Sequence, residues 1–187
     1  SGINSAPAFS PDGRSLVMSL SRDGDPEIYV MDLDSRALLR LTNHPGIDTE
    51  PAWSADGQFI VFTSDRSGSP QLYRMRSHGG TPKRLTFSGS FNGAASIAPR
   101  GGMIAFIHRN GGNYSLAVMR EDGSGLQVLD QGADNQSPSF APNGRMILYA
   151  TRQGGRKVLG AVSVNGDVRQ VFKTPQEEMR EPAWSPN

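Results

Sequence analysis

The sequence predicts an all-β fold, a partial β-propeller of about four antiparallel four-stranded blades with one extra inner strand. A hairpin motif recurs at Pro7, Pro51, Ala95, Pro138 and Pro182, in steps of 44, 44, 43 and 44 residues. Each repeat holds four short strand candidates and almost nothing that reads as helix. Four-stranded repeats of roughly 40–45 residues are typical of propeller blades. A β-sandwich is the alternative, but it has no reason to repeat one anchor and one turn at a fixed spacing.

The composition agrees with short strands joined by turns. The 22 glycines and 13 prolines are spread along the 187 residues. A formal net charge of +1 gives no reason to expect a nucleic acid or an anionic membrane as partner. The chain has no cysteine, which excludes disulfides and thiolate metal ligands. No signal peptide is recognisable, and no apolar run approaches the roughly 18 residues that span a bilayer, so we expect no membrane span.

The first strand of each repeat is expected to end on one large apolar residue that anchors the blade. These anchors are Phe9, Trp53, Ile97, Phe140 and Trp184. Turn pairs such as Asp12-Gly13, Asp56-Gly57 and Asn143-Gly144 follow. Asp-Gly and Asn-Gly favour positive φ angles, so these pairs predict two-residue type I′ hairpin turns.

The other three strands of each repeat are read from their hydrophobicity. The second strand, at 16–20, 59–63, 103–107 and 146–150, is a nearly continuous apolar run, as in strands buried on both faces. The third is centred on residues 28–30, 72–73, 116–118 and 159–161. The fourth is short and half polar, as expected of an outer edge, and ends at Leu41, Leu85, Leu129 and Phe172. Only residues 175–181 read as mildly helical.

These strands divide the chain into one domain of consecutive blades. We expect blades at about 3–43, 47–87, 91–130 and 134–173, and an extra inner strand at 180–187. Because four units are present with one additional first strand, the sequence predicts an incomplete ring.

Several stretches carry a family resemblance that covers the whole chain. "PAFSPDG", "SRDGDPEIYVMD" and "RLTN", together with "GIDTEPAWSADG" and "SPSFAPNGRMILYAT", resemble the TolB family of the Tol-Pal system. The resemblance implies a periplasmic six-bladed propeller whose N-terminal α/β domain and first blades lie outside this sequence. It also implies that the last strand completes the first blade of the ring. The Pro-Asp-Gly hairpin itself is shared with prolyl-oligopeptidase-like propellers.

A binding surface is expected where the repeats differ most. The loops that lead into the inner strands, at 2–6, 43–50, 87–94, 131–137 and 174–181, are polar and unlike one another, whereas the strands agree. Repeats that agree in their strands and differ in the loops on one side fit a scaffold that presents a binding surface.

The resemblance implies which partner this surface takes. In the TolB family it receives the lipoprotein Pal, in support of outer-membrane integrity and invagination during cell division, and colicin translocation segments compete for it. The residues carried over by position are Asn4, Ala6, Thr49 and Glu50, and those from equivalent loops are His44, Asn92, Asn135, Gln136, Arg180 and Glu181. Thr49 and Glu50 could instead merely solvate a loop, and Ile3 stands where the family can carry a polar residue. A contact with TolA is not expected, since the family makes it through the N-terminal segment.

An enzymatic or metal-binding function is not expected. No G-x-S-x-G nucleophile motif and no phosphate-binding glycine motif are present. His44, His78 and His108 lie far apart without metal-ligand spacing, and each is expected to be solvated. Asp23, Asp25 and Glu27 do not follow a calcium-loop pattern and are expected to stabilise a turn. We therefore predict no cofactor and no catalytic residue. Two alternatives remain: a propeller fragment of a prolyl-oligopeptidase-like peptidase, and a structural array that self-associates through exposed blade faces.

Overall fold

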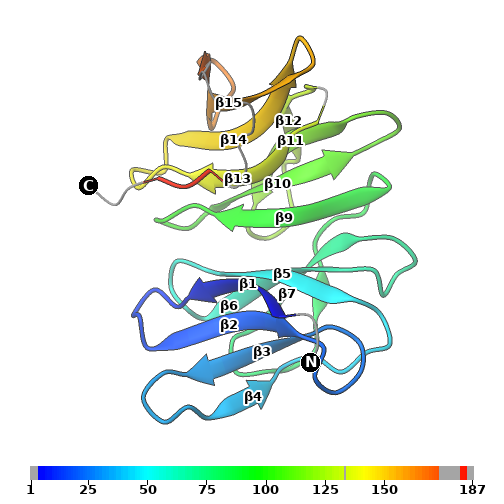
Figure 1. The fold of residues 1–187 in the computed structure, drawn as a ribbon, viewed down its shortest axis with the longest axis vertical. Coiled ribbons are helices and arrows are strands. Elements are labelled where there is room, and N and C mark those ends of the chain that lie inside the picture. Colours follow the sequence, from blue (N-terminus) through cyan, green and yellow to red (C-terminus); the bar gives the residue numbers. More distant parts are fainter. Residues whose placement is uncertain (1–3, 133, 173–181, 185–187) are drawn as a thin grey trace. The chain divides into compact units, whose positions relative to one another are not determined.

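The computed structural model describes residues 4–132, 134–172 and 182–184 (Figure 1). Within these ranges every regular element is a β-strand, and sixteen strands form four antiparallel four-stranded sheets. The prediction of an all-β fold built from four-stranded blades is confirmed. None of the described residues forms a helix that is long and apolar enough to cross a membrane. The chain divides into two compact units, residues 1–87 and 88–187, which are described separately.

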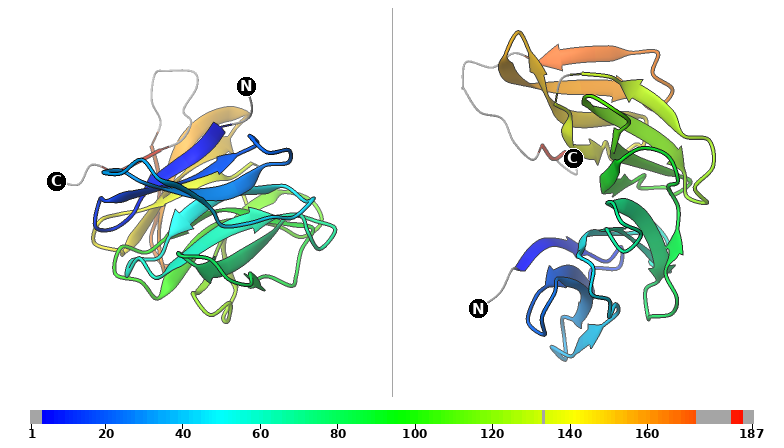
Figure 2. Two further views of the ribbon diagram at one scale, coloured as in Figure 1. Left: turned by 90° about the horizontal axis from the view of Figure 1, so that it is seen from below. Right: turned by 90° about the vertical axis from the view of Figure 1, so that its right-hand side faces the viewer.

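The first unit contains two sheets whose strand order follows the chain (Figures 1 and 2). The first sheet consists of β1 (Asn4–Phe9), β2 (Ser15–Leu20), β3 (Glu27–Asp32) and β4 (Leu38–Arg40). The second consists of β5 (Asp48–Trp53), β6 (Phe59–Ser64), β7 (Gln71–Arg76) and β8 (Lys83–Arg84). The inner strands β1 and β5 pack against each other.

The second unit repeats this plan. Its first sheet consists of β9 (Phe91–Ile97), β10 (Met103–Arg109), β11 (Tyr114–Arg120) and β12 (Gln127–Asp130). Its second consists of β13 (Gln136–Phe140), β14 (Met146–Gln153), β15 (Arg156–Ser163) and β16 (Arg169–Phe172). The inner strand β13 packs on β9 and β10.

Each unit has an apolar core between its two sheets. In the first unit Val17 and Ile28 meet Ile60, Phe62 and Tyr73. In the second unit the core includes Leu116, Val118, Leu129, Phe140, Ile147 and Tyr149. The middle strands β6 and β10 are almost completely buried, as their apolar runs predict, whereas burial alternates along β2.

The hairpin turns between inner and second strands differ from the prediction. Gly13 has φ 70°, but Asp12 is not among the residues with positive φ, so the turn is not type I′. Instead the Gly13 N–H donates to the Ser10 carbonyl at 2.9 Å, and the Ser10 hydroxyl donates to Asp12 Oδ1 at 2.5 Å. A buried serine that closes a longer loop therefore replaces the two-residue turn.

The same turn recurs in the second sheet. The Ser54 hydroxyl donates to Asp56 Oδ1 at 2.6 Å, and the Phe59 N–H donates to Ser54 Oγ at 2.9 Å. The hydrogen bond from Ser54 lowers the pKa of Asp56, as that from Ser10 lowers the pKa of Asp12. Both carboxylates therefore stay ionised at neutral pH, and their hydrogen bonds hold the loop in place.

The predicted anchor residues are buried to different degrees. Trp53 is half-buried against the first core, and its indole N–H donates to the Ala8 carbonyl at 3.0 Å. Phe140 is buried, but Phe9 is 67% exposed, so its prediction as a packed anchor is wrong. The reason is that no described strand of its unit covers that side chain, whereas β1 covers Trp53.

The end of the chain shows a related contact. The Trp184 indole N–H donates to the Ser139 carbonyl at 3.0 Å, across 45 residues, the separation that also joins Trp53 to Ala8. Trp184 therefore meets β13 as Trp53 meets β1. Residues 182–184 have no strand assignment. The rest of the inner strand predicted at 180–187, and the helical stretch predicted at 175–181, lie outside the described residues.

Candidate partner-binding site

A β-bulge interrupts every inner strand at the same place in the repeat. The register shifts between Ser5 and Ala8 on β1, and between Thr49 and Ala52 on β5, with equivalent shifts on β9 and β13. At each bulge one residue other than glycine adopts a left-handed backbone. These residues are Ala6 (φ 51°), Glu50 (φ 52°), Ala94 (φ 53°) and Ser137 (φ 49°).

This conformation is unfavourable for residues with a Cβ atom. Strained backbone of this kind costs about 1–3 kcal/mol per residue and collects at functional sites, where the surrounding structure enforces it. Bulges re-aim the side chains around them and are also over-represented beside functional sites. The bulge falls on Ala6 and Glu50, two residues predicted to contact a partner. We use the term bulge rim as a collective name for these equivalent bulges and the loops that precede them, two in each unit.

A buried polar side chain stands two residues before the left-handed residue on β5, β9 and β13. Asp48, Asn92 and Asn135 are each completely buried. The Asn92 side-chain amide donates to the Ser88 carbonyl at 2.8 Å, and that of Asn135 donates to the Asp130 carbonyl at 3.0 Å. These two predicted site residues therefore hold the preceding loop in place rather than presenting their own surface.

The equivalent residue of the second blade forms a buried ion pair. The Arg66 guanidinium donates to Asp48 Oδ2 at 2.6 Å and lies over the Tyr73 ring, 5.1 Å from its centroid. Burial raises the pKa of Asp48, although hydrogen bonds from Ser64 and Arg66 oppose that shift. On β1, Asn4 takes this register position, because it pairs with Leu20 as Asp48 pairs with Ser64.

Three of the predicted residues are at least partly exposed on the rim of the first unit. Ala6 is exposed on β1, and Thr49 and Glu50 are half-buried on the neighbouring strand β5. The Thr63 hydroxyl donates to Glu50 Oε2 at 2.9 Å, which orients the carboxylate. His44 is half-buried in the loop before β5, where its Nδ1 accepts the Gly46 N–H at 2.9 Å.

Gln136 provides the exposed part of the rim in the second unit. Its amide donates to Asp134 Oδ1 at 3.0 Å, and the Arg152 guanidinium pairs with the other oxygen of that carboxylate at 3.1 Å. The hydrogen bond from Gln136 contributes most to lowering the pKa of Asp134. The result is a hydrogen-bonding surface of an amide, a carboxylate and a guanidinium. Arg180 and Glu181 lie outside the described residues.

Sequence reasoning missed three parts of this site. Arg152 and Asp134 were not predicted, since their pairing joins a strand end to a loop 18 residues away. Asp48 was also missed, although aligning the repeats places it with Asn4, Asn92 and Asn135 and could have found it. His108 was expected to be solvated, but it is only 5% exposed, so that prediction is wrong. A hydrogen bond to Asn92 satisfies the buried ring, with 2.8 Å between His108 Nδ1 and Asn92 Oδ1.

The rim presents mainly hydrogen-bonding groups. Its exposed groups are amides, hydroxyls, a carboxylate on β5 and the Arg152–Asp134 pair. In the part of the chain that the structure describes, no group of three or more His, Cys, Asp or Glu side chains is placed to hold a metal ion.

The comparisons with known proteins point to one family. The model of the TolB beta propeller domain matches residues 1–187. The chain is 62% identical over 132 residues to the Tol-Pal system protein TolB of Gluconobacter oxydans, which covers 70% of this chain and 29% of that protein. The crystal structure of TolB from Acinetobacter baumannii matches with a TM-score of 0.90 at 46% identity, covering 98% of this chain and 46% of that one. The chain thus spans less than half the length of either relative.

A more distant likeness concerns the fold alone. The crystal structure of puromycin hydrolase matches with a TM-score of 0.73 at 15% identity, covering 94% of this chain and 30% of that one. At this identity the likeness shows a shared propeller architecture alone.

Proposed function

The chain belongs to the TolB β-propeller family of the Tol-Pal system, and from this we propose that it is a non-enzymatic module whose bulge rim binds the lipoprotein Pal. Its place of action is the periplasm, where binding supports outer-membrane integrity and invagination during cell division. Colicin translocation segments compete for the same rim.

One observation carries the proposal. The inner strands keep the same bulge with a left-handed residue in all four blades, while the loops beside it differ in sequence. A purely structural strand would have no need to keep Ala, Glu and Ser in a conformation that glycine adopts without strain. Repeated strain beside variable polar loops is what a rigid binding surface with locally tuned contacts requires.

The geometry suggests different roles for the predicted residues. Ala6, Thr49, Glu50, His44 and Gln136 have exposed surface or lie beside it and would contact Pal directly. Asn92 and Asn135 are buried and would act by fixing the loops. We propose a direct contact with Pal for Asn4, Arg180 and Glu181.

Calorimetric titration of purified Pal into this chain tests the proposal. Saturable binding with a one-to-one stoichiometry is expected, and addition of a colicin translocation segment should compete with it. A folded chain that takes up no Pal at micromolar concentration would contradict the proposal.

A further inference from the structure

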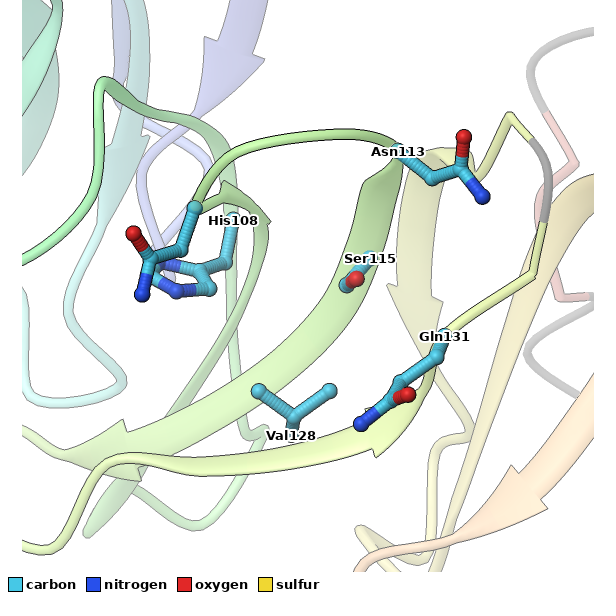
Figure 3. Close-up of a pocket in the computed structure, with 6 residues that line it drawn as sticks. His108, Asn113, Ser115, Val128 and Gln131 are labelled. Atoms are coloured by element: carbon cyan, nitrogen blue, oxygen red, sulfur yellow. The ribbon is translucent and has the colours of Figure 1, made fainter.

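A polar pocket of about 310 Å³ opens in the sheet of β9–β12. Its lining residues are His108, Asn110, Asn113, Ser115, Val128 and Gln131. In Figure 3 the side chains of Ser115 and Val128 lie between that of His108 and those of Asn113 and Gln131. Of these side chains only Gln131 belongs to the bulge rim, in the loop before β13, and His108 is bonded to Asn92 at the bulge of β9.

The repeats explain why this pocket exists. In the sheet of β1–β4 the same place is filled by an ion pair, in which the Arg40 guanidinium donates to Glu27 Oε1 at 2.7 Å. Glu27 pairs with Leu20 in the register of β2 and β3, and Arg40 pairs with Tyr29 in that of β3 and β4. The two long side chains close the space between the third and fourth strands.

In the sheet of β9–β12 both positions carry shorter side chains. Ser115 takes the position of Glu27, since it pairs with His108 as Glu27 pairs with Leu20. Val128 takes the position of Arg40, since it lies opposite Ala117 on the third strand. A hydroxyl and an isopropyl group cannot span this space, so the pocket is the volume that the ion pair occupies in the first blade.

His108 supplies the pocket with a hydrogen-bond acceptor. The Asn92 amide nitrogen donates to Ser88, so its oxygen faces His108 and accepts the proton on Nδ1. Burial lowers the pKa of His108, which keeps the imidazole neutral at physiological pH. The other ring nitrogen, Nε2, therefore carries a lone pair in a residue that is 95% buried and lines the pocket.

The remaining lining groups are neutral. Three primary amides, one hydroxyl and one valine surround the space, and no Lys, Arg, Asp or Glu is among the lining residues. The adjacent Arg109 is engaged elsewhere: its Nε donates to the Gly112 carbonyl at 3.0 Å, and its guanidinium lies over the Tyr114 ring, 5.2 Å from the centroid. Without a lining charge, a carboxylate, phosphate or ammonium would lose hydration with no compensating partner.

We propose that this pocket binds a neutral, hydroxyl-rich small molecule, a monosaccharide. Amides and a hydroxyl can each donate and accept, which suits the alternating hydroxyls of a sugar ring. Val128 offers the one apolar surface, which fits the C–H face of the ring. The proposal does not depend on Pal binding.

A titration followed by amide NMR spectra of the whole chain tests this proposal. Glucose and N-acetylglucosamine serve as neutral probes, and glucosamine and glucuronate carry one positive or one negative charge on the same ring. The neutral sugars should shift the signals of residues 108–115 and 131 with millimolar dissociation constants, as expected for about a dozen heavy atoms. The charged sugars should bind about ten-fold more weakly or not at all. Absence of shifts with both neutral sugars, or equal affinity for the charged ones, would overturn the proposal.

A variant that refills the pocket provides the matched control. The double substitution S115E and V128R recreates the ion pair of the first blade and should weaken sugar binding at least ten-fold while preserving the unfolding midpoint. Should that variant fail to fold, Asn113→Ala with Gln131→Ala removes two exposed amides outside the core and should weaken binding by a similar factor. Unchanged affinity in a folded variant of either kind would refute the assignment of the site.

Discussion

Ala94 provides the most direct test of the strained inner strand. It is half-buried in β9 with φ 53°. The left-handed conformation costs a residue with a Cβ roughly 1–2 kcal/mol, which glycine does not incur. Glycine loses backbone entropy worth about 0.5–1 kcal/mol and gives up part of the roughly 0.8 kcal/mol from burying one methyl group. Ala94→Gly should therefore be neutral or stabilise the chain by about 0.5 kcal/mol.

A matched control separates strain from the general effect of glycine. Ala117 is completely buried in β11 and has no left-handed backbone. Ala117→Gly therefore loses the buried methyl group and raises the entropy cost of folding, with no backbone strain to relieve. It should destabilise by about 1.3–1.8 kcal/mol. The two variants should then differ by about 2 kcal/mol, or about 4–8 °C in unfolding midpoint for a chain of this size. Calorimetric unfolding measures both, and equal destabilisation by the two substitutions would refute the assignment of strain.

Three further predictions concern stability and association. Trp53→Ala should destabilise by about 3 kcal/mol, since a half-buried indole and its hydrogen bond to Ala8 are lost, and a denaturation midpoint no lower than that of a surface variant would contradict this. Burial and the bond to Asp130 raise the pKa of Tyr149, so its contribution to stability is complete below about pH 10 and is lost as pH rises further. Tyr149→Phe should flatten that alkaline decline in unfolding free energy, and an unchanged slope would count against it. Phe9 is 67% exposed, so light scattering should detect concentration-dependent association that Phe9→Ser reduces, whereas a monomer at all concentrations would exclude such association.

The blade architecture could be predicted because its signals are local and repeated. Apolar runs at fixed spacing identify buried strands such as β6 and β10, and glycine pairs mark where they turn. The turn type could not be predicted from Asp12-Gly13 alone, because Ser10 closes the loop with its own hydroxyl. The exposure of Phe9 could not be predicted either, because the burial of an anchor depends on which strand packs beside its side chain.

The candidate site was only partly readable from sequence. Divergent loops predict a binding surface beside the inner strands, but Ala, Glu and Ser give no indication of a left-handed backbone, so the bulge became visible only in the structure. Asn92 was expected to contact a partner because it belongs to a polar loop, but it is completely buried and supports the loop instead. The pocket beside His108 was likewise hidden. It exists because Ser115 and Val128 are shorter than Glu27 and Arg40 at the equivalent positions, and that equivalence is seen only from the strand register.

Charge reversal at Glu50 tests the central claim that the bulge rim binds Pal. Calorimetry should be run on Glu50→Lys and on Asp34→Lys, an exposed residue in the turn between β3 and β4, at the end of its sheet away from the bulge. Reversing a charge in a desolvated contact costs a few kcal/mol, so Glu50→Lys should weaken Pal binding about 100-fold with an unchanged circular dichroism spectrum. Asp34→Lys should bind as the unmodified chain does. Equal affinity of all three folded proteins for Pal would contradict the account.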